Sequence, residues 1–169
     1  MMKIIRVVIG LSLLLWAVSA FGQKVSTESA PNVNWSQYKT YSWGQGESVA
    51  SPIMNQNIVA AIDSQLSAKG FKKVDSEGDL VVIFNTTTDS QKQLNWNSFG
   101  GWGRFGGGMG SAQVENIVSG QLIVDIADPK TKQFLWRGTA MDTVSDNAQK
   151  NEKKVTNAVT KMFQKFQSK

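Results

Sequence analysis

The chain has 169 residues and a net charge of +5 at neutral pH. It contains no histidine and no cysteine, so we expect no disulfide, no cysteine-linked lipid anchor, and neither of the residues that most often serve as general base or zinc ligand. The basic residues are spread along the chain, and this mild positive charge does not indicate a nucleic-acid-binding protein.

Residues 1–22 have the pattern of a secretory signal peptide. Lys3 and Arg6 precede an apolar run at residues 7–18, and small residues follow. Such a run forms about 18 Å of helix, whereas the hydrocarbon core of a membrane is roughly 30 Å thick. We therefore favour cleavage over a membrane anchor. The cut would follow Ala20 or, preferably, Gly22, and the product would be exported, most simply to a periplasm.

The polar residues 23–37 predict a flexible lead-in, followed by one domain at 38–168. The stretch 38–43 (YKTYSW) is rich in strand-forming residues, and its alternation places Tyr41 and Trp43 on the same face. These residues predict a first strand.

A helix is predicted next, because both of its ends and its apolar stripe can be read. Ser51 and Pro52 suit the N-cap and the first helical position, and Gly70 marks the end. The apolar stripe repeats at helical spacing through Ile58, Ile62 and Leu66.

Two strands and a long loop follow this helix. Residues 71–74 predict a short strand, and the β-branched run at 80–88 predicts a buried one. Residues 89–112 are polar, then rich in glycine and aromatic residues, and we interpret them as a long loop or a ragged hairpin tip.

A hairpin is predicted between residues 114–127 and 134–144, joined by a turn at Asp128 and Pro129. Alternation along the second strand predicts that Phe134 and Trp136 share one face. The opposite face would carry Leu135 and every second residue after it. These residues include Arg137, which is predicted to face solvent. Gly138, on the Trp136 face, would allow close packing or a bulge.

The last predicted helix begins after Ser145 or Asp146 as its cap. It has the clearest apolar stripe of the chain, formed by Val155, Ala158, Val159, Met162, Phe163 and Phe166. The element order is therefore strand, helix, two strands, long loop, two strands, helix. It predicts an α+β sandwich in which two helices cover one face of an antiparallel-rich sheet of about five strands.

Five segments taken together resemble, in order, a bacterial envelope family known only as domain of unknown function 4136. They are WSQYKTYSW at 35–43, the helical stripe of 58–71, DLVV at 79–82, GQLIVD at 120–125 and LWRG at 135–138. The resemblance covers residues 35–166. It implies an exported protein with a glycine-rich aromatic insertion at 95–110, and it brings no reaction, cofactor or catalytic residue.

Residues 101–106 match the dinucleotide-binding pattern G-x-G-x-x-G, but the context is wrong. That turn must follow a buried strand and open a helix, whereas here it lies inside GGWGRFGGGMG. We interpret the match as accidental and expect no cofactor. The surrounding segment is instead a candidate partner-binding surface, through Trp96, Phe99, Trp102, Arg104 and Phe105.

The sequence therefore predicts a non-enzymatic envelope or binding protein whose partner is an envelope protein or a glycan. Two alternatives stay open. One is a hydrolase that uses Asp125 or Asp142, taken as neighbours across the hairpin, with Lys or Ser. The other is an assembly factor that pairs through a sheet edge next to residues 89–112. No calcium-loop spacing is present, so we expect no metal.

Overall fold

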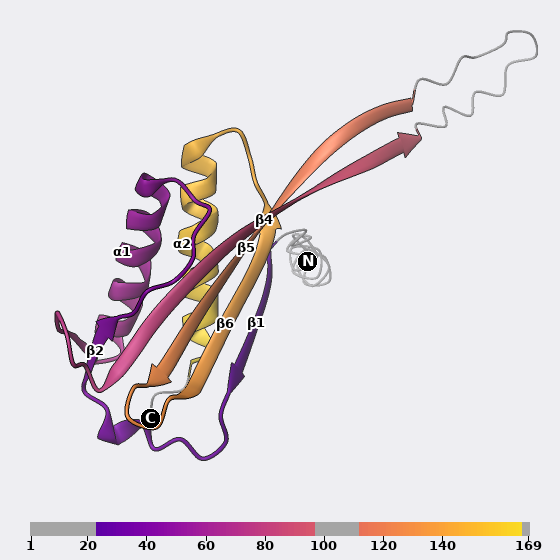
Figure 1. Cartoon of the computed structure of the whole chain (residues 1–169). Helices are drawn as coiled ribbons and strands as arrows, with labels where there is room; N and C mark the ends of the chain where they lie inside the picture. The colour runs from indigo at the N-terminus through magenta and orange to yellow at the C-terminus, as the bar shows by residue number, and fades with distance from the viewer. Residues whose placement is uncertain (1–22, 97–111, 167–169) are drawn as a thin grey trace, which may run out of the picture.

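The computed structural model describes residues 23–96 and 112–166, which form two helices packed on one face of a six-stranded sheet (Figure 1). The elements in chain order are β1 (Lys24–Ser29), the 3-10 helix η1 (Trp35–Gln37), β2 (Thr40–Trp43), α1 (Pro52–Ala68), β3 (Lys72–Lys73), β4 (Leu80–Trp96), β5 (Ala112–Asp128), β6 (Gln133–Thr143) and α2 (Ala148–Gln164). The predicted signal peptide lies outside the described residues.

The sheet confirms the α+β class and corrects the predicted layout. Its strand order is β1-β6-β5-β4-β2-β3. Strands β1, β6, β5 and β4 pair antiparallel, whereas β2 pairs parallel with both β4 and β3. The sheet is mixed, because α1 connects β2 to strands that run in the same direction. It has six strands rather than five, because β1 adds an edge strand.

The predicted lead-in at 23–37 is wrong, because it contains the edge strand β1. Val25 lies opposite Ala140 of β6, and Thr27 lies opposite Gly138. Only one side of β1 is partly buried, so the strand needs few apolar residues. Its sequence therefore gives little sign of a strand.

The helix ends agree with the sequence for α1 and differ for α2. The Ser51 side chain accepts a hydrogen bond from the Met54 N–H, and Gly70 adopts φ +89 after the helix, as its role as a stop signal requires. In α2 the N-cap is Asn147, whose side chain accepts from the Lys150 N–H. The predicted caps, Ser145 and Asp146, precede it.

Two residues of the predicted apolar stripe, Phe163 and Phe166, pack against Trp136 of β6 in the core. The Trp136 ring lies 5.1 Å from that of Phe163 and 5.2 Å from that of Phe166, centre to centre. Gly138 lets α2 approach β6, since a Cβ atom there would lie 2.8 Å from the Met162 sulfur. The predicted roles of Trp136 and Gly138 are thus confirmed.

A β-bulge reverses the predicted faces at the start of β6. Between Ile126 and Ala127 the register shifts, so that Ile126 pairs with Trp136 and Ala127 pairs with Phe134. Leu135 is consequently buried, whereas Phe134 is exposed and lies beside the Arg137 guanidinium. A bulge places one extra residue in a strand, and simple alternation cannot anticipate it.

Strands β4 and β5 continue past the rest of the sheet as a two-stranded arm, residues 90–96 and 112–118 (Figure 1). The pairing runs to Trp96 opposite Ala112, whereas β6 ends at Thr143, opposite Ser119. The predicted loop 89–112 is therefore partly strand. Within the described ranges, no helix is long and apolar enough to cross a membrane.

Candidate functional site

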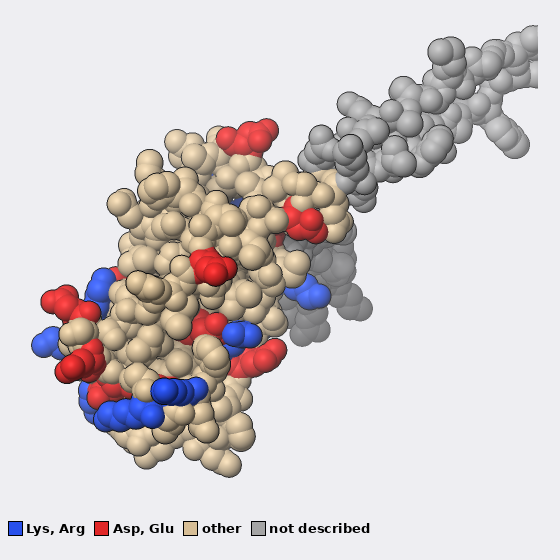
Figure 2. Space-filling view, viewed as in Figure 1, with Lys and Arg blue, Asp and Glu red and all other residues tan. Residues whose placement is uncertain are grey.

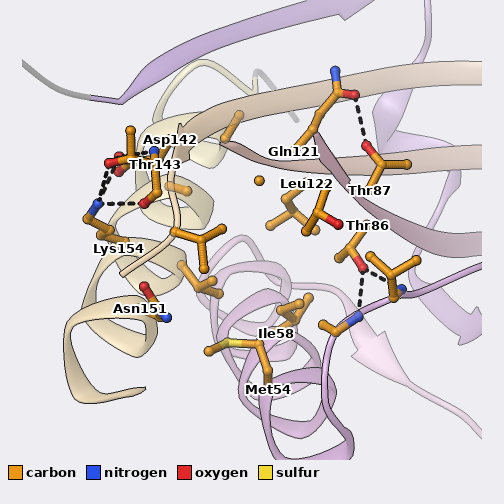
Figure 3. Close-up of a pocket in the computed structure, with 18 of the residues that line it drawn as sticks. Met54, Ile58, Thr86, Thr87, Gln121, Leu122, Asp142, Thr143, Asn151 and Lys154 are labelled. Atoms are coloured by element: carbon orange, nitrogen blue, oxygen red, sulfur yellow. Dashed lines mark hydrogen bonds and ion pairs between the residues drawn. The ribbon is translucent and has the colours of Figure 1, made fainter. Parts of the chain in front are cut away.

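A pocket of about 310 Å³ opens on the helix side of the sheet, at the end from which the arm extends (Figure 3). The N-terminal halves of α1 and α2 form one wall, and β4, β5 and β6 form the other. A volume of this size is at the lower end of the range of small-molecule binding sites.

The pocket has an apolar floor. Ile58 of α1 and Leu122 of β5 are 1% and 6% exposed, and they belong to the core below. Two small residues, Ala140 of β6 and Ala158 of α2, line the same space. Because neither alanine side chain is large enough to fill the space between helix and sheet, this space remains open as the pocket.

Two polar side chains of the pocket wall, Thr86 and Asn151, are already hydrogen-bonded within the protein. The Thr86 hydroxyl accepts from the N–H groups of Val49 and Ala50, at 3.0 and 3.3 Å. The Asn151 amide donates to the Ser145 carbonyl at 2.6 Å, and its oxygen accepts from the Ser145 N–H at 2.9 Å. These groups hold the loops that frame the pocket. In contrast, the side-chain oxygen of Gln23, which also lines the pocket, is buried and has no hydrogen-bond partner among the described residues.

One ion pair lies at the pocket wall. The Lys154 ammonium donates to the Asp142 carboxylate at 3.0 Å and to the Thr143 carbonyl at 2.7 Å (Figure 3). The two side chains are 34% and 24% exposed, so this pair closes the edge of the pocket against α2 and neutralises both charges.

Exposed apolar side chains surround the entrance. Val49 is 65% exposed and Val144 is 44% exposed, and both line the pocket. Ile53, in the first turn of α1, is 72% exposed. An apolar floor that continues into an exposed apolar rim is typical of a contact surface for an apolar group.

The candidate carboxylates are not neighbours, which corrects the sequence analysis. Asp125 lies opposite Arg137, whereas Asp142 lies opposite Gly120 and lines the pocket. The Arg137 guanidinium donates to both oxygens of Asp125, at 2.6 and 2.9 Å, and this hydrogen bonding raises the pKa of Arg137. Asp128 forms the predicted turn by accepting from the Lys130 N–H at 2.7 Å.

Of the predicted partner-binding residues, the structure describes only Trp96. Trp96 is the last residue of β4, at the end of the arm, and Phe99, Trp102, Arg104 and Phe105 lie outside the described residues. Sequence reasoning missed the pocket, because Ala140 and Ala158, which lie in the apolar faces of the last strand and the last helix, have the pattern of ordinary core residues. In the part of the chain that the structure describes, no group of three His, Cys, Asp or Glu side chains could hold a metal ion.

The fold is a two-layer α+β domain with a pocket between helices and sheet and a projecting β-arm. The chain belongs to the domain of unknown function 4136 (DUF4136) family, whose model matches residues 25–166. This match confirms the resemblance seen in the sequence and extends it to β1. No curated protein matches the chain.

Solved structures show the same fold at low sequence identity. A DUF4136 family protein from Bacteroides thetaiotaomicron gives a TM-score of 0.55 at 13% identity, over 84% of this chain and 94% of that one. The PelC dodecamer from Paraburkholderia phytofirmans gives 0.51 at 12% identity, over 83% and 93% of the two chains. A PDZ domain protein from Parabacteroides distasonis gives 0.54 at 15% identity over 83% of this chain, which spans only 35% of that protein.

Proposed function

We propose that this protein is an exported, periplasmic envelope protein that binds an apolar group of a partner in the pocket and catalyses no reaction. The observation that carries the proposal is the continuous apolar surface from the floor, at Ile58 and Leu122, to the exposed rim at Val49 and Val144. Binding there would be driven by removal of apolar surface from water.

The arrangement of the carboxylates supports binding rather than hydrolysis. A hydrolytic acid or base must reach the substrate with a free carboxyl group. Asp142 is held by Lys154 at the pocket wall, and Asp125 is held by Arg137 and does not line the pocket. The hydrolase alternative therefore has no geometric support among the described residues.

Export is supported by the signal-peptide pattern of residues 1–22. The envelope assignment rests on this pattern and on membership of the DUF4136 family. An assembly factor is the second candidate function. It is favoured by the projecting arm, and the similarly folded PelC forms a dodecamer.

A titration with a fluorescent naphthylamine tests the binding proposal on the purified mature protein. We expect saturable fluorescence enhancement, and we expect it to be lost in Val144→Asp, which places a charge at the pocket rim. Met141→Asp is the matched control, because Met141 is also exposed, at 45%, and does not line the pocket. Equal loss in both variants, or no saturable signal in the native protein, would refute the proposal.

Export is tested separately by fractionation of cells that express the full chain. We expect a processed protein in the periplasmic fraction, with an N-terminus at Gln23 or Phe21. A full-length protein in the cytoplasm would overturn the assignment to the envelope without bearing on the pocket.

A further inference from the structure

We propose that the occupant of the pocket is the glycine-aromatic segment, residues 97–111, of a second copy of this chain. This inference rests on the proposed function, since it names the partner whose apolar group the pocket binds. Each copy would present its arm to the pocket of the next copy, so the contact joins two different surfaces of the same protein.

The first support is the arm itself. Beyond Asp89 and Ser119, β4 and β5 pair as strands only with each other among the described residues, out to Trp96 opposite Ala112. One backbone hydrogen bond, from the Val144 N–H to the Val118 carbonyl at 2.7 Å, ties the base of this arm to the residue after β6. A two-stranded ribbon without a core is at best marginally stable in water. An arm of this kind is expected to be stabilised by contact with another surface.

The second support is the match between the segment and the pocket. The segment carries three aromatic residues, Phe99, Trp102 and Phe105, separated by glycines. An apolar cavity of roughly 150 Å³ holds one benzene molecule. The pocket, at about 310 Å³, has room for an indole ring or for two phenyl rings.

The third support is the direction of the arm, which favours another molecule over the same one. Thr88 of β4 and Gly120 of β5 line the pocket at the base of the arm. The last described pair, Trp96 and Ala112, lies eight residues beyond Thr88 and Gly120, which is about 25 Å at the usual rise of a strand. Figure 1 shows this ribbon leading away from the helices.

Charge is compatible with the same partner. Arg104 is the only charged residue between positions 97 and 111. On the face shown in Figure 2, most Lys and Arg side chains lie in the half of the domain away from the arm, whereas acidic side chains lie in both halves, including the half nearest the arm. A single cation on the entering segment therefore approaches a surface with few cations of its own.

Complementation between two variants tests the proposal in sedimentation experiments on the mature protein. The pocket variant carries Val49→Asp and Val144→Asp, at exposed positions, and the segment variant carries Phe99→Ser, Trp102→Ser and Phe105→Ser. We expect the native chain to associate and each variant alone to associate at least about tenfold more weakly, because buried aromatic anchors dominate such contacts. An equimolar mixture should restore association, since it contains one intact segment and one intact pocket.

Restoration in the mixture also shows that both variants are folded. A native chain that stays monomeric, or variants that associate as the native chain does, would overturn the proposal. If naphthylamine binding to the native pocket persists in either case, the proposed binding function survives and only the identity of its occupant is wrong.

In-cell photo-crosslinking provides the second readout. A photoreactive residue replaces Trp102, and Lys153, exposed on α2, is the control position. We expect an adduct of two chains that joins position 102 to a peptide of the pocket wall. An adduct within one chain, to a different protein or to lipid, would overturn the proposal.

Discussion

Tyr41 and Asp63 join the sheet to helix α1 through a hydrogen bond of 2.7 Å from the Tyr41 hydroxyl to the carboxylate. The same carboxylate oxygen accepts from the Trp43 indole N–H at 3.0 Å, and the other oxygen accepts from the Lys73 ammonium at 3.0 Å. One side chain of α1 thus satisfies donors from both β2 and β3, and it fixes the position of the helix on the sheet.

Replacement of Asp63 by alanine is expected to destabilise the protein. The Tyr41 side chain is 1% exposed, so its hydroxyl would lose its partner without gaining water. An unsatisfied buried donor costs about 1–3 kcal/mol. Urea unfolding measures the change. The control is Asp75→Ala, at an exposed turn position, and an equal effect in both variants would contradict this role for Asp63.

Stability at alkaline pH is expected to depend on Tyr41. Burial, and then the hydrogen bond to Asp63, raise the pKa of Tyr41 in the folded state. The unfolded tyrosine loses its proton near pH 10, while the folded one keeps it. The contribution of this group is therefore complete below about pH 10 and falls as the pH rises further.

The measurement is the free energy of unfolding of the native chain and of Tyr41→Phe between pH 8 and 11. The native chain should be the more stable at pH 8, and the difference should shrink toward pH 11. Trp43→Phe removes a neighbouring donor that does not titrate, so its difference from the native chain should stay constant. Parallel behaviour of the two variants would count against the assignment.

Replacement of Gly138 by alanine is expected to strain the contact between β6 and α2. The added Cβ would lie 2.6 Å from the Trp136 ring and 2.8 Å from the Met162 sulfur. Overpacking of this kind costs about 1–3 kcal/mol, measurable as a lowered melting temperature. Gly120→Ala is the matched control, because its Cβ would meet the end of the Val144 side chain at 3.0 Å and the Asp142 carbonyl at an ordinary contact distance of 3.9 Å. The hypothesis fails if Gly120→Ala is the more harmful change.

Asp79 is expected to contribute to the loss of stability in acid. Hydrogen bonds from the Lys39 and Thr40 N–H groups, and from the Thr40 hydroxyl, lower its pKa in the folded state. This contribution is present above the ordinary aspartate pKa of about 3.9 and is lost as the pH falls through the lower folded value. The gap in unfolding free energy between the native chain and Asp79→Asn should therefore shrink below pH 4. A gap that stays constant from pH 6 to pH 3 would exclude this role.

The parts of the fold that could be predicted are those where a residue pattern reflects a buried face. The stripes of α1 and α2 repeat at helical spacing, and Ile58 and Phe163 are buried as their spacing predicts. Strand β1 and the arm lack such a pattern for a physical reason. One is an edge strand and the other leaves the core, so neither needs a regular apolar face.

The pocket could not be predicted, because it depends on space that the side chains do not fill. Ala140 and Ala158 are ordinary core residues in sequence, and only their juxtaposition across two elements leaves a gap. The prediction that Asp125 and Asp142 are neighbours failed because the short connection between Asp128 and Gln133 sets the hairpin register. This register places Asp142 opposite Gly120, which is five residues from Asp125 along β5.

The arm lies beyond the end of β6 at Thr143, so its length can vary while the pairing of β5 with β6 stays the same. Matched insertions of two residues in each strand would move its end by about 7 Å and keep every side chain on its original face. Changes of one residue would reverse the faces. Within this architecture, reach is thus a property that can be adjusted in discrete steps, independently of the stability of the domain that carries it.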